Sequence, residues 1–301
     1  MDRVRRRLVQ GGLAAGAGVL LPRFSLAQMT VGRGTVTSVS DGSLMLPRDF
    51  ILGGLPEDEL APILAEHGIA GDQLTPPCNV TLYQDGENTV LFDVGSGSEF
   101  VPTAGTLFDS LDAVDVAPED VTHVVFTHGH PDHLWGLLDD FGDPAFTEAQ
   151  YLMGRAEWDY WTDPETVNTI DAERQAFAVG AARRLDMIAD QVEVFEDDDT
   201  VLPGITAVMT PGHTPGHMSF EVGDTDGVFV TGDAVANHHV AFARPDWEVN
   251  SDQDPVTGAV TRTVLMNRLA EARATILGFH LPSGGIGRIG RRDTGFIFEE
   301  A

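Results

Sequence analysis

The chain of 301 residues is long enough for one large domain or two small ones, and 42% of its residues are hydrophobic and 22% charged. These proportions are typical of a globular protein with a substantial core, and they exclude disordered, collagen-like and disulfide-stapled architectures. The net charge is −29, with 47 acidic residues against 18 basic ones. Nucleic-acid binding requires cations that displace counterions from phosphates, so we expect a small-molecule substrate and no nucleic-acid partner. The single cysteine, Cys78, excludes an intramolecular disulfide and is expected to be a buried thiol.

The first 27 residues have the pattern of an export signal. Basic residues at 5–7 precede an apolar run of small residues from 11 to 21, and small residues at 25 and 27 form a cleavage site. Paired arginines followed by Leu-Val resemble the twin-arginine type, which exports folded proteins. We expect a mature domain of residues 28–301, without a membrane anchor, that is periplasmic or secreted. The alternative is a basic N-terminus that the mature protein keeps.

Over residues 28–301, short runs of β-branched and aromatic residues alternate with segments of helical periodicity, which predicts a single α/β domain. The predicted strands are 35–39, 79–83, 89–92, 121–127, 205–209, 219–222, 228–231 and 274–277. The predicted helices are 57–67, 105–112, 134–139, 171–189 and 257–272. Asp-Gly pairs at 41–42 and 85–86 predict hairpin turns.

Seven histidine and aspartate residues each follow the end of a predicted strand. They are His128, His130, Asp132 and His133 after strand 121–127, His213 after 205–209, Asp233 after 228–231 and His280 after 274–277. Imidazole and carboxylate groups in this combination are typical ligands of zinc-type metal ions. Loops at strand ends converge on one crevice in α/β proteins, so we expect these side chains to meet. The sequence therefore predicts a metal centre.

The spacing of these residues resembles the dinuclear metal signature of the metallo-β-lactamase superfamily. The resemblance covers essentially the whole of residues 28–301 and implies an αββα sandwich, in which helices cover two β-sheets and the metals lie at one edge. It also implies a ligand assignment. His128, His130 and His213 would hold the first metal, Asp132, His133 and His280 the second, and Asp233 would bridge both.

Two zinc-type divalent ions about 3.5–4 Å apart can share a bridging hydroxide and polarise a substrate oxygen. Metal binding lowers the pKa of water from about 15.7 to about 7, so the nucleophile exists at neutral pH. Asp132 can orient this hydroxide or pass its proton to the leaving group, which makes it the candidate catalytic residue. The implied reaction is the hydrolysis of an ester-like bond.

Within the superfamily, the sequence resembles the exported branch around methyl parathion hydrolase and the quorum-quenching lactonases. The similar segments are 40–47, 127–137, 212–216 and 276–288. By alignment, Phe100, Trp161 and Phe177 fall where that hydrolase has aromatic residues around its leaving-group pocket. An apolar pocket of this kind suits a lactone or an organophosphate-like substrate. The alternative is that these aromatic residues belong to the core.

One position departs from the lactonase pattern. Lactonases of this superfamily commonly have a tyrosine three residues after the bridging aspartate, where this chain has Ala236. A lactonase would need another donor to the substrate carbonyl, and His238 and His239 are candidates, unless they are a solvated pair in a loop. The segment 49–74 resembles an N-terminal extension able to cover the site or a partner, so a homodimer is one expectation from family analogy.

Two other functions remain open from the sequence. The first is an oxidoreductase on the same fold, resembling a persulfide dioxygenase with one iron, although His133 and His280 complete a second ligand set. The second is a non-catalytic exported metal-binding protein, although no ligand of the set is missing. Metal content separates the oxidoreductase from the hydrolase, because the first requires one iron and the second two zinc-type ions.

Overall fold

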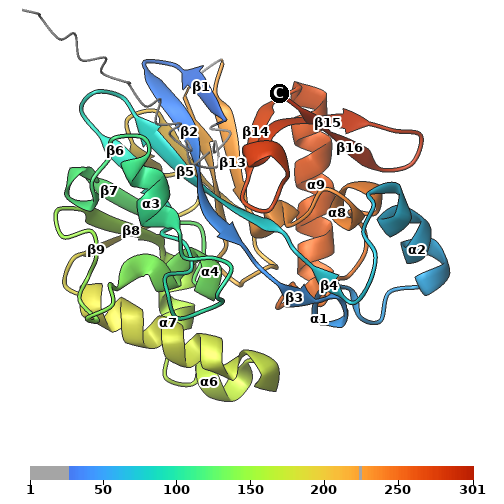
Figure 1. Ribbon diagram of the computed structural model, residues 1–301, viewed down its shortest axis with the longest axis horizontal. Coiled ribbons are helices and arrows are strands. Elements are labelled where there is room, and N and C mark those ends of the chain that lie inside the picture. The colour runs from blue at the N-terminus through green and yellow to red at the C-terminus, as the bar shows by residue number, and fades with distance from the viewer. Residues whose placement is uncertain (1–26, 224–225) are drawn as a thin grey trace, which may run out of the picture.

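The computed structural model describes residues 27–223 and 226–301. In these residues, two seven-stranded sheets pack face to face and helices cover their outer sides (Figure 1). This arrangement confirms the predicted αββα sandwich. The predicted export signal, apart from Ala27, lies outside the described residues. None of the helices in the described ranges has the length and apolar composition needed to span a bilayer.

The first sheet has the strand order β1-β2-β5-β6-β7-β8-β9. Its strands are β1 (Gln28–Val31), β2 (Gly34–Ser43), β5 (Pro77–Gln84), β6 (Thr89–Phe92), β7 (His123–Phe126), β8 (Gln150–Gly154) and β9 (Val192–Phe195). Strands β6 to β9 run parallel to one another, so their carboxyl ends share one edge of the sheet. The helices of this half are α3 (Leu107–Asp112), α4 (Pro131–Leu134), α5 (Arg155–Thr162), α6 (Thr166–Thr169) and α7 (Gln175–Ile188).

The second sheet runs from β10 to β16 in chain order, and only β13 and β14 are parallel within it. Its strands are β10 (Thr200–Leu202), β11 (Ile205–Met209), β12 (Met218–Val222), β13 (Val228–Gly232), β14 (Thr275–Gly278), β15 (Ile286–Arg291) and β16 (Phe296–Glu300). Its helices are α8 (Val240–Ala243) and α9 (Pro255–Ala272).

A smaller unit lies beside the sandwich and next to α8, at the lower right of Figure 1. It contains β3 (Leu46–Pro47), α1 (Arg48–Leu52), α2 (Glu57–Glu66) and β4 (Gln73–Leu74). Short 3-10 helices complete the described elements: Pro118–Asp120, Trp135–Leu137, Ala172–Arg174, Asp233–Val235 and Ser283–Gly285.

Three apolar layers hold the sandwich together. The middle layer lies between the sheets, where the rings of Phe92 and Phe220 are 5.1 Å apart. The outer layers pack helix against sheet, with Leu185 of α7 on one side and Leu265 of α9 on the other. Each fully buried side chain of this size contributes about 1.5–3 kcal/mol relative to exposure. These layers fix the edge at which the strand ends meet.

Each strand predicted from the sequence overlaps an observed strand, and the Asp85-Gly86 turn lies between β5 and β6 as expected. The turn predicted at Asp41-Gly42 is wrong, because both residues lie within β2, at a register shift between Ser40 and Gly42. The Asp41 carboxylate is buried and accepts hydrogen bonds from distant backbone N–H groups, which favours the strand over a turn. The helix predicted at 134–139 is also wrong, since α4 ends at Leu134 and a 3-10 turn follows.

Candidate metal centre

The segment after β7 presents four candidate ligands in two directions. His128 follows the end of β7, His130 has an extended backbone, and Pro131 begins α4 directly after it. Proline suits this first helical position because its missing N–H has no partner there in any case. Asp132 and His133 therefore lie on the first turn of a helix, so the backbone changes conformation between the pair His128 and His130 and the pair Asp132 and His133. This local geometry lets one short segment serve two clusters.

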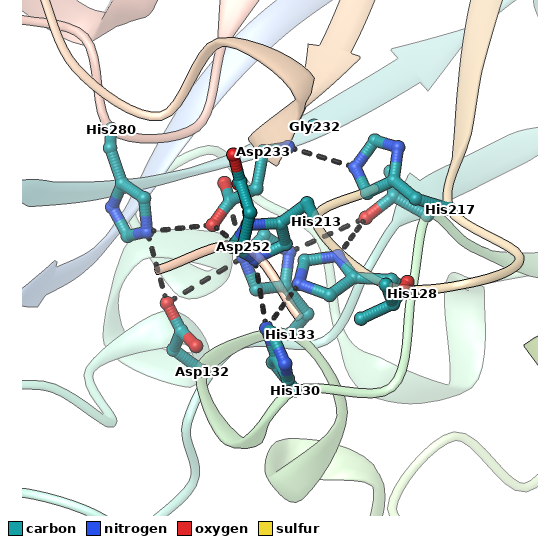
Figure 2. A network of polar contacts seen from close by, with 12 residues as sticks. His128, His130, Asp132, His133, His213, His217, Gly232, Asp233, Asp252 and His280 are labelled. Atoms are coloured by element: carbon teal, nitrogen blue, oxygen red, sulfur yellow. Dashed lines mark hydrogen bonds and ion pairs between the residues drawn. The ribbon is translucent and has the colours of Figure 1, made fainter. Parts of the chain in front are cut away.

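The other candidates come from the second sheet and reach the same edge (Figure 2). His213 lies in the loop between β11 and β12, Asp233 follows β13, and His280 follows β14. Because β13 and β14 are parallel, their carboxyl ends deliver Asp233 and His280 side by side. Gly232 has a φ of +48°, and a Cβ there would lie 2.6 Å from His217 Nε2, so this turn requires glycine.

The structure brings the seven predicted residues together in two adjoining clusters. The first contains His128, His130 and His213, and the second contains Asp132, His133, Asp233 and His280. Within each cluster, one ligand atom of every residue lies within 4.8 Å of the others. The Oδ2 atom of Asp233 is 3.3 Å from Nε2 of His213 and 3.3 Å from Nε2 of His280. Asp233 therefore contacts both clusters.

The donor set fits divalent cations. In the first cluster, His130 Nδ1 lies 3.1 Å from His128 Nε2 and 2.9 Å from His213 Nε2. In the second, the buried atoms His133 Nε2 and Asp233 Oδ1 have no hydrogen-bond partner among the described residues. An unpartnered buried polar atom costs about 1–3 kcal/mol. Imidazole nitrogen and carboxylate oxygen atoms therefore face one another in the second cluster, and two of them lack a hydrogen-bond partner. Both atom types are common ligands of zinc-type ions.

In four of the five histidines, the ring nitrogen that faces away from the clusters contacts an oxygen atom, and this contact orients the ring. These contacts are His128 Nδ1 to Thr127 Oγ1 at 3.0 Å, His133 Nδ1 to Asp93 Oδ2 at 2.7 Å, His213 Nδ1 to Asp252 Oδ1 at 3.2 Å and His280 Nδ1 to the Pro77 carbonyl at 2.7 Å. An acceptor on one nitrogen fixes the tautomer and leaves the lone pair of the other free for a metal. The rings are thus preorganised as ligands.

The two clusters differ in charge. Burial lowers the pKa of His128 and His130 well below the ordinary value, and the neighbouring imidazoles add to the effect. Burial would also lower the pKa of His133, but the carboxylates of Asp132 and Asp233 outweigh it and raise this pKa to about 10. His128 and His130 therefore offer neutral nitrogen ligands, and the second cluster adds the carboxylates of Asp132 and Asp233, whose negative charge a cation can balance.

A pocket of about 370 Å³ opens over the clusters. His130, Asp132, His213, Asp233 and His280 line it together with apolar residues. Those apolar residues include Leu44, Leu46, Phe50, Ile51, Ile69 and Leu74. Much of this wall comes from the segment 49–74, which agrees with its expected role as a cover of the site. The volume suits a small organic molecule.

Of the aromatic residues predicted for the pocket, Phe100 and Phe177 line it, with their rings edge to face at 6.0 Å. Trp161 is 1% exposed and lies behind His130, with 5.8 Å between the ring centres. Its indole N–H donates to Glu157 Oε1 at 2.6 Å, which holds it in the core. The predicted pocket role of Trp161 does not match this placement.

Several supporting residues were not recognised from the sequence. The Asp252 carboxylate joins His213 to the buried Arg262, from which it lies 3.0 Å away. Nothing in the local pattern around residue 252 indicates this role, because its partners are remote in the sequence. His217 accepts a hydrogen bond from the backbone N–H of Asp233 at 3.0 Å.

The sequence model described as the metallo-beta-lactamase superfamily matches residues 75–272. The solved structure of AidC, a dizinc quorum-quenching lactonase in complex with a product, superposes with a TM-score of 0.85 at 21% identity, covering 92% of this chain and 97% of that one. At this identity the likeness shows the fold. The hydrolase AbOPH of the beta-lactamase superfamily has a TM-score of 0.83 at 28% identity, with the same coverage. The N-acyl homoserine lactonase of Bacillus cereus is 27% identical over 109 residues, 36% of each chain.

Proposed function

The chain belongs to the metallo-β-lactamase superfamily, and from this we propose that it is a dinuclear zinc-type hydrolase acting on an ester-like bond of a lactone or organophosphate-like molecule. The observation that carries the proposal is the pair of complete ligand clusters at a mainly apolar pocket. The structurally similar AidC is a dizinc lactonase, and the Bacillus cereus relative is an N-acyl homoserine lactonase.

In this proposal, His128, His130 and His213 hold one ion, Asp132, His133 and His280 hold the other, and Asp233 contacts both. The division follows the two clusters, and the position of Asp233 between His213 and His280 supports its bridging role. When bound, two divalent ions would lower the pKa of water and polarise the substrate oxygen.

Asp132 is the proposed catalytic residue. Its carboxylate lines the pocket, and Oδ2 lies 3.1 Å from His280 Nε2. Burial by itself raises the pKa of Asp132, but His133 and His280 outweigh it, so this pKa lies below the ordinary value. An ionised carboxylate in this position can accept the proton of the attacking water and pass it to the leaving group. Substrate atoms beyond the reacting bond would pack against Phe100 and Phe177.

The lactone substrate is supported by the Bacillus cereus relative and by the apolar wall, which suits an acyl chain. Ala236 lines the pocket and supplies no hydroxyl group, whereas His238 and His239 line the same pocket. We propose these histidines as the donors to the substrate carbonyl. The organophosphate-like substrate is supported by Phe100 and Phe177, which can pack against an aryl leaving group.

The test follows proton release when zinc-loaded protein meets a long-chain acyl-homoserine lactone, with a parallel assay on an aryl phosphotriester. Acidification that a chelator abolishes is expected with the lactone, and Asp132→Ala should abolish it while the protein stays folded. Full activity of Asp132→Ala would refute the mechanism. Metal analysis separates the alternatives: two zinc-type ions per chain support the hydrolase, and one iron supports the oxidoreductase. No turnover of either substrate by folded, zinc-loaded protein would favour a metal-binding role.

We also propose export through the twin-arginine-type signal in residues 1–27, on the basis of its sequence pattern. N-terminal sequencing of protein recovered outside the cytoplasm should begin at residue 28. A mature protein that retains residues 5–7 would contradict cleavage at this site. Sedimentation of the mature protein would test the expected homodimer.

A further inference from the structure

Glu157 is a fully buried carboxylate that lies on the first turn of α5. Its Oε1 atom accepts hydrogen bonds from the backbone N–H of Gly129 at 2.9 Å and the indole N–H of Trp161 at 2.6 Å. Its Oε2 atom accepts from the hydroxyl of Thr214 at 2.7 Å and the backbone N–H of Gly216 at 3.0 Å. All four partners donate, and none of them is a cation. Four donors fill the acceptor sites of this carboxylate.

These hydrogen bonds reach two loops that are far apart in the sequence. Gly129 lies between His128 and His130, and Thr214 directly follows His213. One carboxylate therefore ties together both loops that carry the first cluster. It has no hydrogen bond to any residue of the second cluster.

The backbone is shaped for this contact. A Cβ at Gly129 would lie 2.5 Å from the Trp161 ring, and a Cβ at Gly216 would lie 2.1 Å from the backbone nitrogen of Glu157. Both distances are too short for any side chain, so glycine is required at these positions for the N–H groups to reach the carboxylate. The loops are thus built around Glu157.

We propose that Glu157 is a positioning residue that holds the His128–His130 and His213 loops at the spacing needed to bind a metal ion in the first cluster. The inference rests on the proposed function, since it requires that the clusters bind metal. Hydrogen bonds behind the ligands typically change metal affinity by about 10–100-fold when they are removed. The proposal predicts an effect on one cluster and not on the other.

The experiment measures Zn²⁺ affinity in two backgrounds that each leave one cluster complete. His280→Ala leaves the first cluster complete, and His130→Ala leaves the second. Adding Glu157→Gln should weaken Zn²⁺ binding by about 10–100-fold in the His280→Ala protein. In the His130→Ala protein the change should stay below about twofold, because Glu157 has no hydrogen bond to any residue of the second cluster. Competition with a chromophoric chelator reports both affinities without any substrate.

Asp41→Asn is the matched control. Asp41 is another buried carboxylate that accepts backbone N–H groups, from Ser96 and Leu107, but these lie outside the ligand loops. The Asp41→Asn substitution should lower the stability of the metal-free protein and leave the Zn²⁺ affinity in both backgrounds unchanged. Should Glu157→Gln fail to fold, Thr214→Val removes a single donor and should give a smaller effect with the same selectivity for the first cluster.

Equal weakening in the two backgrounds, or weakening in neither, would overturn the role of Glu157 and leave the proposed metal centre intact. Selective weakening in the His130→Ala background would overturn it as well. Absence of Zn²⁺ binding to the unsubstituted protein would instead refute the metal centre itself, and the positioning role with it. The outcomes therefore separate a failure of this inference from a failure of the proposed function.

Discussion

The substitution Asp93→Asn tests whether the histidines are held by the residues behind them. Asp93 lies just after β6 with a φ of +69°, a left-handed conformation that asparagine adopts more readily than most residues. The change therefore preserves backbone and volume and alters only the carboxylate. Its Oδ1 atom accepts the Thr127 N–H, and its Oδ2 atom accepts from the Thr127 hydroxyl and from His133 Nδ1, each at 2.7 Å.

In the variant, the amide oxygen can keep the bond to the Thr127 N–H, and the amide nitrogen then faces two donors. Two hydrogen bonds to a charged acceptor are lost, and His133 loses the group that fixes its tautomer. We expect Zn²⁺ affinity at the second cluster to fall about 10–100-fold, which corresponds to about 1.4–2.7 kcal/mol. Metal-free protein should lose about 1–3 kcal/mol of unfolding free energy because of the unpaired groups.

Competition titration with a chromophoric chelator measures the affinity, and urea unfolding of metal-free protein measures the stability. Asp198→Asn is the matched control, because Asp198 has a φ of +63° but lies exposed in the turn between β9 and β10. It should change neither quantity. Wild-type Zn²⁺ affinity in Asp93→Asn would refute the reasoning that the oxygen behind His133 prepares it as a ligand.

Three further expectations follow from burial and binding. Burial raises the pKa of Cys78 to about 12, so its thiol should resist a thiol reagent at pH 8 until urea unfolds the protein; prompt labelling of native protein would contradict this. Burial lowers the pKa of His239 to about 3, and because the unfolded state takes up the proton first, stability should fall as the pH drops below about 6.5. Between pH 7.5 and 5 the unfolding free energy of the wild type should fall by about 2 kcal/mol more than that of His239→Asn. Urea unfolding at each pH measures this, and an equal fall in the two proteins would contradict it. Removing Zn²⁺ that was present at about 100 times its Kd should lower the unfolding free energy by about 2.7 kcal/mol. A chelator should therefore lower the Tm, and an unchanged Tm would argue against Zn²⁺ binding to the folded state.

The sequence predicted the strands whose side chains are strongly apolar and β-branched, such as β6 and β11, because these residue types have a high propensity for strands. It did not predict β8, β9 or α5. The signal of α5 is weak because the side chains buried on it include the charged Glu157, which local periodicity assigns to solvent. The turn predicted at Asp41-Gly42 is wrong for the same reason, since a buried aspartate next to glycine has the local pattern of a turn.

The family resemblance and the set of candidate ligands follow from the sequence alone. The segment from His128 to His133 is short enough for spacing alone to indicate a metal site, and His213, Asp233 and His280 each follow a predicted strand. The resemblance also implied how these ligands divide into two sets, and the structure has the same two clusters. The residues that hold the ligands in place, in contrast, could be found only from the tertiary structure. Glu157 and Asp252 meet their partners across 57 and 39 residues of sequence, through hydrogen bonds to Thr214 and His213. Such pairings depend on how the two sheets pack, because a buried carboxylate is stable only where the fold brings donors to it.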